Sequence, residues 1–281
     1  MKSSLWVDEF HLGQRYGIEG KVLLEKQTPF QKIKVIESKK YGRGLLLDNC
    51  WMATEYHEKN YHECLVQPAM TSSKKINKIL IIGGGDGGSA KQCFLHQDID
   101  QIDLVEIDEE VIEVCKKYLS AIGGNAWDNP LLKIHIEDGK KWVSQIPDET
   151  YDVIIIDSSD PIGPAKGLFN KEFYTNCKRI LKNDGVLAAQ SESPYSFFEI
   201  HIETVKLLKN VFDFADPIYG SMPIYPSGWW SWTFAAKNAK RYLNPQLNRC
   251  HISENCIIWS PRWHKASFSA IPAFLDREFA N

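Results

Sequence analysis

The stretch Ile81–Ala90, IIGGGDGGSA, decides the fold, because it joins a continuous apolar run to a glycine-rich turn. The run KILIIG at 78–83 is typical of a parallel strand whose two faces are both covered. A glycine-rich turn after such a strand usually presents backbone N–H groups to a phosphate. Asp86 stands in the middle of these glycines. A carboxylate at that point indicates a ligand that brings positive charge.

Strand-like and helix-like segments alternate after this turn. Apolar residues between 109 and 122 recur with the helical period, and short apolar runs flank that segment. We expect helices at 89–97, 109–122 and 197–212, and strands at 102–107, 132–136, 152–156, 186–189, 214–219 and 231–236. This alternation predicts βαβ units, and therefore an α/β fold with a Rossmann-like, doubly wound sheet.

The first part of the chain has a different pattern. Residues 15–55 contain short β-rich runs with glycines at the turns, which predicts a small antiparallel β domain. A helix over 57–70 is expected to stop near Pro68. The polar segment TSSKKIN at 71–77 is the best connector. We therefore expect an N-terminal β-strand domain at 1–72 and a Rossmann-like catalytic domain at 73–281.

Composition excludes several classes of protein. The 281 residues carry a net charge of -3, so the basic excess of a nucleic-acid-binding protein is missing. The apolar runs are too short to span a membrane, and the N-terminus lacks the apolar core of a signal peptide. The seven cysteines form no CxxC pair, which favours reduced thiols and a cytoplasmic location.

The histidine-containing segments do not predict a metal site. In HEKNYHE, His57 and His62 are five residues apart, so they cannot share a zinc ion as residues at i and i+4 do. Cys250, His251 and Cys256 are too few and unsuitably spaced. We therefore expect no metal.

Acidic side chains follow four successive predicted strands. They are Asp86, Glu106, Asp138 and Asp157. In doubly wound sheets the ligand lies beyond the carboxyl ends of the strands, so these carboxylates are expected at one rim. Glu106 follows Gly88 by 18 residues, the distance at which an acid commonly holds a ribose diol.

The charge of this rim predicts the class of ligand. Carboxylates crowded in a cleft need a counter-charge. Such a rim disfavours NAD and ATP, and it favours an S-adenosyl sulfonium compound with further amines. Asp157 and Asp160 could bind one amine together or two in turn. An alkylammonium, with a pKa of ~10.4, must lose a proton before it attacks, and a carboxylate can accept that proton.

Several motifs occur in the order and spacing of one family. They are LIIGGGDGG, VEID, EDG, DVIIIDSSDPIGPAKGLF and MPIYPSG. With them the chain resembles the polyamine aminopropyltransferases of the spermidine synthase type from about Trp6 to Phe279. The resemblance implies transfer of the aminopropyl group of decarboxylated S-adenosylmethionine, a co-substrate, to putrescine. The products would be spermidine and methylthioadenosine. It also implies no separate cofactor and a homodimer or homotetramer.

The resemblance assigns roles to individual residues. Asp157 would be the base, assisted by Tyr61. The donor would be bound by Gln31, His62, Gly83, Asp86, Glu106, Asp138, Gly139 and Pro164. The acceptor would be bound by Trp6, Asp160, Gln190 and Tyr225. Residues 158–169 would form a mobile gate over the site.

The acceptor half departs from the family pattern. Met52 stands where relatives commonly have a glutamine, and Met222, Trp229 and Trp230 lie in or beside the segment that lines the acceptor channel. Aminopropyl transfer to cadaverine, agmatine or spermidine is therefore an open alternative. A conventional methyltransferase and a non-catalytic polyamine-binding protein are the others.

Overall fold

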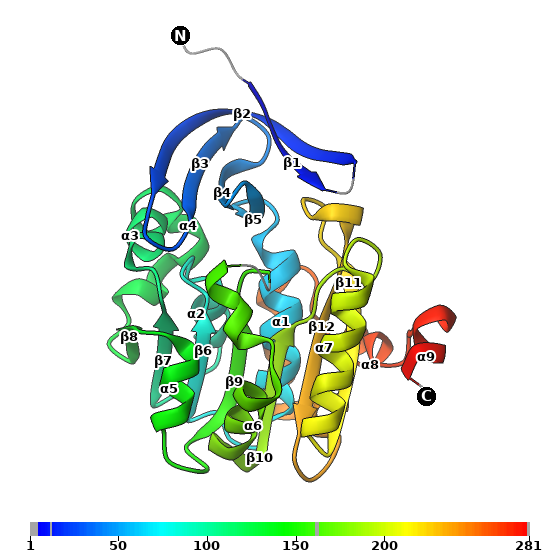
Figure 1. Ribbon diagram of the computed structural model, residues 1–281. Helices are drawn as coiled ribbons and strands as arrows, with labels where there is room; N and C mark the ends of the chain where they lie inside the picture. Colours follow the sequence, from blue (N-terminus) through cyan, green and yellow to red (C-terminus); the bar gives the residue numbers. More distant parts are fainter. Residues whose placement is uncertain (1–4, 12, 161–162, 280–281) are drawn as a thin grey trace.

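The computed structural model describes residues 5–11, 13–160 and 163–279, and it contains two β-sheets (Figure 1). The smaller is antiparallel throughout, in the order β1-β2-β3-β4-β5. Its strands are β1 (Leu5–His11), β2 (Gln14–Gln27), β3 (Lys32–Ser38), β4 (Gly42–Leu47) and β5 (Cys50–Thr54). A small antiparallel β domain is confirmed, although the strand β1 was not expected from the sequence.

The larger sheet has seven strands in the order β11-β12-β10-β9-β6-β7-β8. They are β6 (Lys78–Gly83), β7 (Gln101–Glu106), β8 (Leu132–Ile136), β9 (Tyr151–Asp157), β10 (Leu181–Gln190), β11 (Phe214–Ser221) and β12 (Trp229–Ala236). The strands from β10 to β8 are parallel, while β12 runs antiparallel to both β10 and β11. The predicted Rossmann-like fold class is thereby confirmed.

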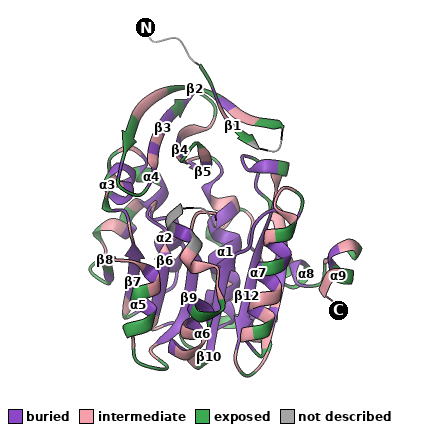
Figure 2. Ribbon diagram, viewed as in Figure 1, coloured by how far each residue is buried: buried purple, intermediate pink, exposed green. Residues whose placement is uncertain are grey.

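The apolar run of β6 is buried on both faces, as its lack of alternation predicts. Ile79 and Ile81 pack toward α1 and α2, whereas Leu80 and Ile82 pack toward α5, α6 and α7. The bounds are α1 (Glu58–Ser72), α2 (Gly88–Cys93), α5 (Gly139–Gln145), α6 (Lys171–Ile180) and α7 (Phe198–Val211). Each buried isoleucine contributes about 1.5–3 kcal/mol. Figure 2 shows the resulting layer of buried strands between helices.

The small sheet lies over the carboxyl ends of the parallel strands (Figure 1). Ile33, Val35 and Leu45 of this sheet share a buried cluster with Val111 and Val114 of α3 (Glu109–Tyr118). The contact covers the rim where the strand-end carboxylates lie. The next turn forms a separate short helix, α4 (Ser120–Gly123), so the single helix expected over 109–122 is divided at Leu119.

Two other predicted helix boundaries are wrong. The helix α1 continues past Pro68 to Ser72, because a proline removes only one helical hydrogen bond and side chains bind the last carbonyl groups. The hydroxyls of Thr71, Ser72 and Ser73 donate to the carbonyl oxygens of Gln67, Pro68 and Ala69. The helix α2 ends at Cys93 rather than at residue 97.

The helix α1 packs against the large sheet, since Leu65, Val66 and Ala69 share a buried cluster with Ile79 and Ile81. By packing, it therefore lies with the Rossmann-like part of the chain. The division between residues 72 and 73 stays a prediction.

The described residues contain no helix that is both long and apolar enough to cross a membrane. The cysteines are free thiols, of which Cys64, Cys93, Cys115 and Cys177 are buried. The C-terminal segment ends in two short helices, α8 (Pro261–Ser267) and α9 (Ala273–Phe279).

A buried glutamate fastens the C-terminal segment to α1. Glu63 is fully buried, and its carboxylate accepts hydrogen bonds from the backbone N–H groups of Ile257, Ile258 and Trp259 at 2.7–3.0 Å. These N–H groups belong to a loop without strand or helix partners, so the carboxylate replaces the bonds that regular structure would give. The residue before Glu63 is His62. The hydrogen bonds of Glu63 therefore hold the part of α1 that reaches the carboxylate rim.

We expect Glu63→Gln to lower the free energy of unfolding by about 1–3 kcal/mol, because an amide cannot satisfy the same buried N–H groups. Urea denaturation followed by circular dichroism measures this change. Glu113→Gln is the matched control: its side chain is 61% exposed and pairs with Lys116 across one helical turn. That change should stay within about 0.5 kcal/mol. Equal effects of the two substitutions on the free energy of unfolding would contradict the stabilising role of Glu63.

Candidate active site

A large cavity opens where the parallel strands end beneath the small sheet. The strand ends place Gly83, Glu106 and Asp157 on its wall, and Asp138 joins them from the start of α5. The other lining residues are Gln31, Leu45, Leu47, Met52, Tyr61, His62, Ile82, Gly84, Gly85, Asp86, Val105, Ile107, Val111, Gly139, Ser158, Ser159, Ala165, Leu168 and Tyr225. The expectation that the four carboxylates share one rim is therefore met by the geometry.

The first glycines of the turn allow the ends of β6 and β9 to approach each other closely. Gly83 has a φ of +80°, and a Cβ atom there would lie 2.1 Å from the carbonyl oxygen of Asp157. The N–H group of Gly84 donates to that same oxygen at 2.8 Å. The turn thus fixes the end of β9, and with it the backbone of Asp157, against the end of β6.

Asp86 lies beside a buried histidine. Its Oδ1 accepts a hydrogen bond from the N–H of Gly88 at 2.9 Å and is 3.4 Å from Nε2 of His62. The other ring nitrogen of His62, Nδ1, is 3.0 Å from Oε2 of Glu58. Burial opposes the charged imidazole, but the neighbouring carboxylates, first that of Asp86, raise the pKa of His62 well above 6.5. Burial likewise opposes the charge of Asp86, yet His62 lowers the pKa of this carboxyl.

Asp157 has the surroundings of a general base. Burial, and then the charge of Asp86, raise the pKa of Asp157 despite the opposing effect of His62. A raised pKa moves a carboxylate toward the pH at which it accepts protons efficiently. Ser89 donates to its Oδ2 at 2.7 Å and so orients the group. Tyr61 lines the cavity close by: burial and the charge of Asp157 raise the pKa of its phenol.

Glu106 is suited to hydroxyl groups. Its Oε1 accepts from the N–H of Asp108 at 3.0 Å, and burial raises the pKa of Glu106 to about 7. A Cβ at Gly85 would lie 3.0 Å from Oε2, so the glycine leaves this oxygen room. A diol with two O–H donors would satisfy the carboxylate in its charged form.

Two predicted residues flank this position. Gln31 donates from Nε2 to Oδ2 of Asp108 at 3.1 Å, and Thr28 donates to the same oxygen at 2.7 Å. These bonds tie the turn before β3 to the start of α3. Asp138 accepts from the N–H of Lys140 at 2.8 Å as the cap of α5, and it also lines the cavity.

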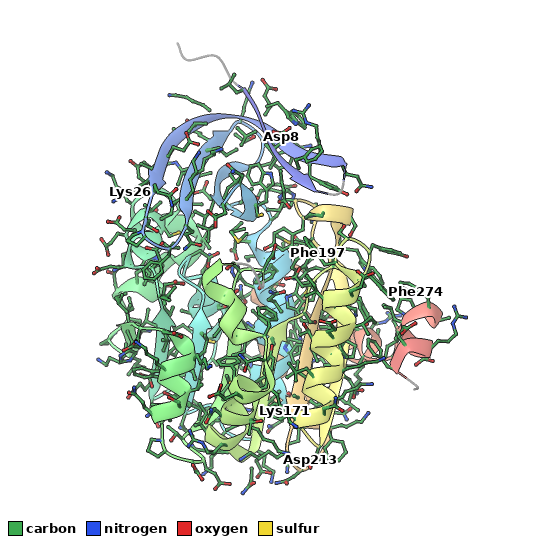
Figure 3. The ribbon with its side chains drawn as sticks, viewed as in Figure 1. Asp8, Lys26, Lys171, Phe197, Asp213 and Phe274 are labelled. Carbon is green, nitrogen blue, oxygen red and sulfur yellow. The ribbon has the colours of Figure 1, made fainter. Side chains whose placement is uncertain are left out.

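A small cavity adjoins the large one. The two share Met52, Tyr61, Ser158, Ser159 and Tyr225. The small cavity is further lined by Glu9, Cys50, Trp51, Asp160, Gln190, Phe197, Pro226 and Trp230. Figure 3 shows Phe197 at the end of α7 that faces the small sheet. Burial, and then the charges of Glu9 and Asp160, raise the pKa of the Cys50 thiol to about 12, which reflects the negative charge gathered here.

Three buried polar atoms around the small cavity lack hydrogen-bond partners within the described structure. They are Nε1 of Trp51, Nε1 of Trp230 and Oγ of Ser158. Unpartnered buried polar atoms are rare in folded proteins and often mark a place for a ligand or water. The carboxylates of this cavity indicate a positively charged occupant, whereas the two indole N–H groups need an acceptor such as a water oxygen.

Two acidic residues of this region were missed by the sequence reasoning. Glu9 lies on β1, which the sequence did not reveal, and Glu192 follows Gln190 at the end of β10. Glu192 is fully buried, and its Oε1 accepts a hydrogen bond from Nε2 of Gln190 at 3.2 Å. Burial, and then Asp160, raise its pKa well above 4.5. The signal was present in the sequence: Glu192 follows the end of β10 by two residues, as the other carboxylates follow the earlier strands.

Some predicted acceptor residues lie elsewhere. Trp6 is 58% exposed, because on β1 it faces away from Val7 and Glu9, so the structure does not bring it to either cavity. Trp230 lines the small cavity, whereas Trp229 packs against Tyr195 and Tyr219. Tyr225 lines both cavities, and its hydroxyl donates to the carbonyl oxygen of Met52 at 2.6 Å.

Part of the predicted gate falls outside the described residues, namely 161–162. Pro164 belongs to the 3-10 helix η2 (Gly163–Leu168), and its side chain also lies outside the described part. Ala165 and Leu168 of this helix line the large cavity. The mobility of the gate stays a prediction.

Among the described residues, atoms of His62, Asp86 and Asp157 lie within 4.8 Å of one another, as metal ligands do. Both ring nitrogens of His62 face carboxylates, so the ring offers N–H groups there rather than a lone pair. The histidine already supplies positive charge to this group. The geometry therefore gives no support for a metal, and its predicted absence stays a prediction.

Comparison with known proteins agrees with this arrangement. Residues 58–245 match the family model of the spermine/spermidine synthase domain, and residues 5–55 match that of the spermidine synthase tetramerisation domain. The chain belongs to the spermine/spermidine synthase family. The resemblance seen in the sequence motifs is thereby confirmed.

Individual relatives cover almost the whole chain. A polyamine aminopropyltransferase of Prochlorococcus marinus (strain NATL2A) is 57% identical over 278 residues, which span 99% of this chain and 96% of the relative. A crystal structure of spermidine synthase in complex with the transition state analogue AdoDATO has a TM-score of 0.93 at 33% identity, covering 98% and 95% of the two chains. The spermidine synthase of Thermotoga maritima has a TM-score of 0.91 at 33% identity, covering 98% and 94%. This chain is therefore an enzyme of the aminopropyltransferase type.

The pKa of Glu106 predicts how nucleoside binding depends on pH. We expect the affinity for methylthioadenosine to be highest above pH 7 and to fall by up to about tenfold per pH unit below it, because the diol binds the ionised carboxylate. Calorimetric titration between pH 6 and 8 measures this. Glu106→Gln should bind more weakly at pH 8 and show no such dependence. An affinity of the native enzyme that is constant over this range would contradict the assignment.

Proposed function

We propose that the enzyme transfers the aminopropyl group of decarboxylated S-adenosylmethionine to putrescine and forms spermidine and methylthioadenosine. One observation carries the proposal: a large cavity with nucleoside-type and cation-type sites meets a small acidic cavity beside Asp157 and Tyr61. Two substrates bound in these cavities would meet at a buried carboxylate. The relative solved with a transition state analogue supports the same reaction class.

The donor occupies the large cavity. Glu106 accepts hydrogen bonds from the ribose hydroxyls, while Gln31, Asp138 and Gly139 contact the nucleoside. Asp86 binds the aminopropyl ammonium beside His62, and the turn at Gly83 lies under the sulfonium end. Pro164 and the rest of η2 cover the donor. Asp86 distinguishes this site from that of a methyltransferase, which must accommodate the carboxylate of the methionine moiety.

The transfer itself requires orientation and the removal of one proton. The acceptor nitrogen attacks the methylene carbon next to sulfur, and the carbon–sulfur bond breaks with its electron pair going to sulfur. Asp157 accepts the proton that the amine loses, and Tyr61 lies beside this carboxylate. Holding the reactants in line lowers the barrier without any covalent intermediate.

The acceptor occupies the small cavity, where Asp160 binds its ammonium group and Gln190 and Tyr225 line its path. Glu9 adds negative charge to the region, and Glu192 adds a carboxyl group whose pKa burial raises. Phe197 and Trp230 limit its extent, which favours a short diamine such as putrescine. Met52 offers no polar group at the junction, so another amine such as cadaverine, agmatine or spermidine is the alternative.

The reaction needs no further cofactor, because the sulfonium is already a good leaving group. The proposal also includes a cytoplasmic location, where both substrates would be found, and excludes nucleic acid and membrane as partners. It rests on the composition of the chain and on the chemistry of the reaction.

The decisive experiment measures methylthioadenosine release from decarboxylated S-adenosylmethionine with a panel of amines. We expect release with putrescine as the best acceptor. Asp157→Asn should lower turnover by about 10²-fold or more while it leaves donor binding intact, because the amide cannot accept the proton. Faster release with another amine would reassign the acceptor. Release with no amine, despite donor binding, would favour a binding protein.

We further propose that the enzyme is a homo-oligomer, a homodimer or homotetramer. The small sheet matches a tetramerisation domain, and one face of β1 exposes Trp6 and Phe10, 58% and 71% exposed. Exposed apolar side chains grouped on one strand are typical of an interface.

Light scattering after size exclusion should give a mass of at least twice the 32.2 kDa of the chain. The double substitution Trp6→Ser with Phe10→Ser should shift the protein toward monomer. Leu247→Ser is the matched control, because Leu247 is 91% exposed and lies outside the small sheet. A monomeric native protein would overturn the proposal.

A further inference from the structure

His62 is held between carboxylates that come from three elements of the fold. Glu58 faces Nδ1 from one turn earlier on α1, while Asp86 and Asp157 face Nε2 at 3.4 and 4.0 Å from the glycine turn and the end of β9. A neutral imidazole has one N–H and one lone pair, and a lone pair would face a carboxylate unfavourably. Both nitrogens therefore carry protons in the unliganded enzyme. The raised pKa of His62 agrees.

The ring has little freedom to leave this position. Only 2% of His62 is exposed, and a Cβ atom added to Gly88 would lie 2.1 Å from the ring. The imidazole thus lies directly against the turn that carries Asp86. A ligand that binds Asp86 therefore contacts the His62 imidazole, which can gain or lose a proton but has no room to move.

The charges around His62 are balanced only in part. The charged groups that face it are Glu58, Asp86 and Asp157, with Lys91 3.3 Å from Glu58 on its far side, and Tyr61 adds a neutral phenol. With His62 protonated, three negative charges are opposed by two positive ones. The donor adds an ammonium and a sulfonium. Two further positive charges would leave this buried group with an excess of positive charge, which low polarity makes costly.

We propose that His62 is a replaceable counter-ion: it holds the proton that balances Asp86 and Asp157 in the empty site and releases it when the donor's ammonium binds. The inference rests on the proposed function, because it requires a donor with an ammonium group. The proton on Nε2 goes to solvent, and the ring stays as the neutral tautomer with its N–H toward Glu58. The freed lone pair of Nε2 then accepts a hydrogen bond from the ammonium, which also binds Asp86.

Calorimetry in buffers of different ionisation enthalpy counts the protons released on binding. Decarboxylated S-adenosylmethionine should release about one proton more per site than methylthioadenosine at the same pH. The second ligand carries the same nucleoside but neither positive charge, so any proton released by Glu106 is common to both. The affinity for the donor, relative to that for methylthioadenosine, should rise by up to about tenfold per pH unit while His62 is protonated in the free enzyme.

Two variants assign the proton to His62. His62→Gln should bind the donor without the additional proton and without the additional pH dependence, because an amide both donates and accepts hydrogen bonds but does not titrate here. His251→Gln is the matched control at an exposed histidine, and it should behave as the native enzyme does. If His62→Gln does not fold, the ¹⁵N spectrum of histidine-labelled native enzyme should show one ring changing from the charged to the neutral form on donor binding.

The outcomes separate the inference from the proposed function. Equal proton release by both ligands, or unchanged additional release in His62→Gln, would overturn the inference while donor binding still supports the function. Failure of both ligands to bind would overturn the proposed function and the inference together.

Discussion

The site depends on one electrostatic constraint: several carboxylates are buried together, and each needs a counter-charge or a hydrogen-bond donor. Asp86 has the N–H of Gly88 and His62, Asp157 has Ser89, and Glu106 has the N–H of Asp108. These partners do not remove the cost of the buried charges: burial, and then the charges of Asp108 and Asp157, raise the pKa of Glu106 to about 7. The empty site is thus prepared for cations, and substrate binding relieves a cost that folding imposes.

The backbone of the large sheet and the helix α1 together hold the carboxylates and their partners in position. The close contact of Gly83 with the Asp157 carbonyl fixes Asp157, the proposed base, through the sheet itself. The helix α1 supplies Tyr61 and His62 from one side, and the bonds of Glu63 to the C-terminal segment hold it from the other. The small sheet then covers the rim, with Asp108 joining Thr28 and Gln31 to α3. Contacts outside the large cavity therefore set the positions of Asp157, Tyr61 and His62 within it.

The parts of this structure that the sequence predicted are those with a strong local signal. The run at 78–83 and the glycine turn predicted the sheet, and the carboxylates after its first four parallel strands predicted the rim of the large cavity. Features that depend on tertiary contacts were missed or misplaced. The helix α1 runs through Pro68 because hydroxyl groups satisfy its last carbonyls, and β1, which brings Glu9 to the small cavity, has no pattern that distinguishes it from a loop. The family resemblance assigned Trp6 to the acceptor site, whereas β1 directs this side chain outward.

This contrast explains why the donor is more firmly defined than the acceptor. The residues proposed to bind the donor lie mainly at the ends of adjacent strands, whose positions follow from the sheet. The small cavity, proposed for the acceptor, is lined from β1, β5, the end of β10 and the loop before β12, which are far apart in sequence and meet only through packing. Tyr225 joins two of these by its bond to the Met52 carbonyl. A change in Met52 or Phe197 would alter the shape of the small cavity while Asp157 keeps its place, so the choice of amine can vary while the transfer chemistry stays the same.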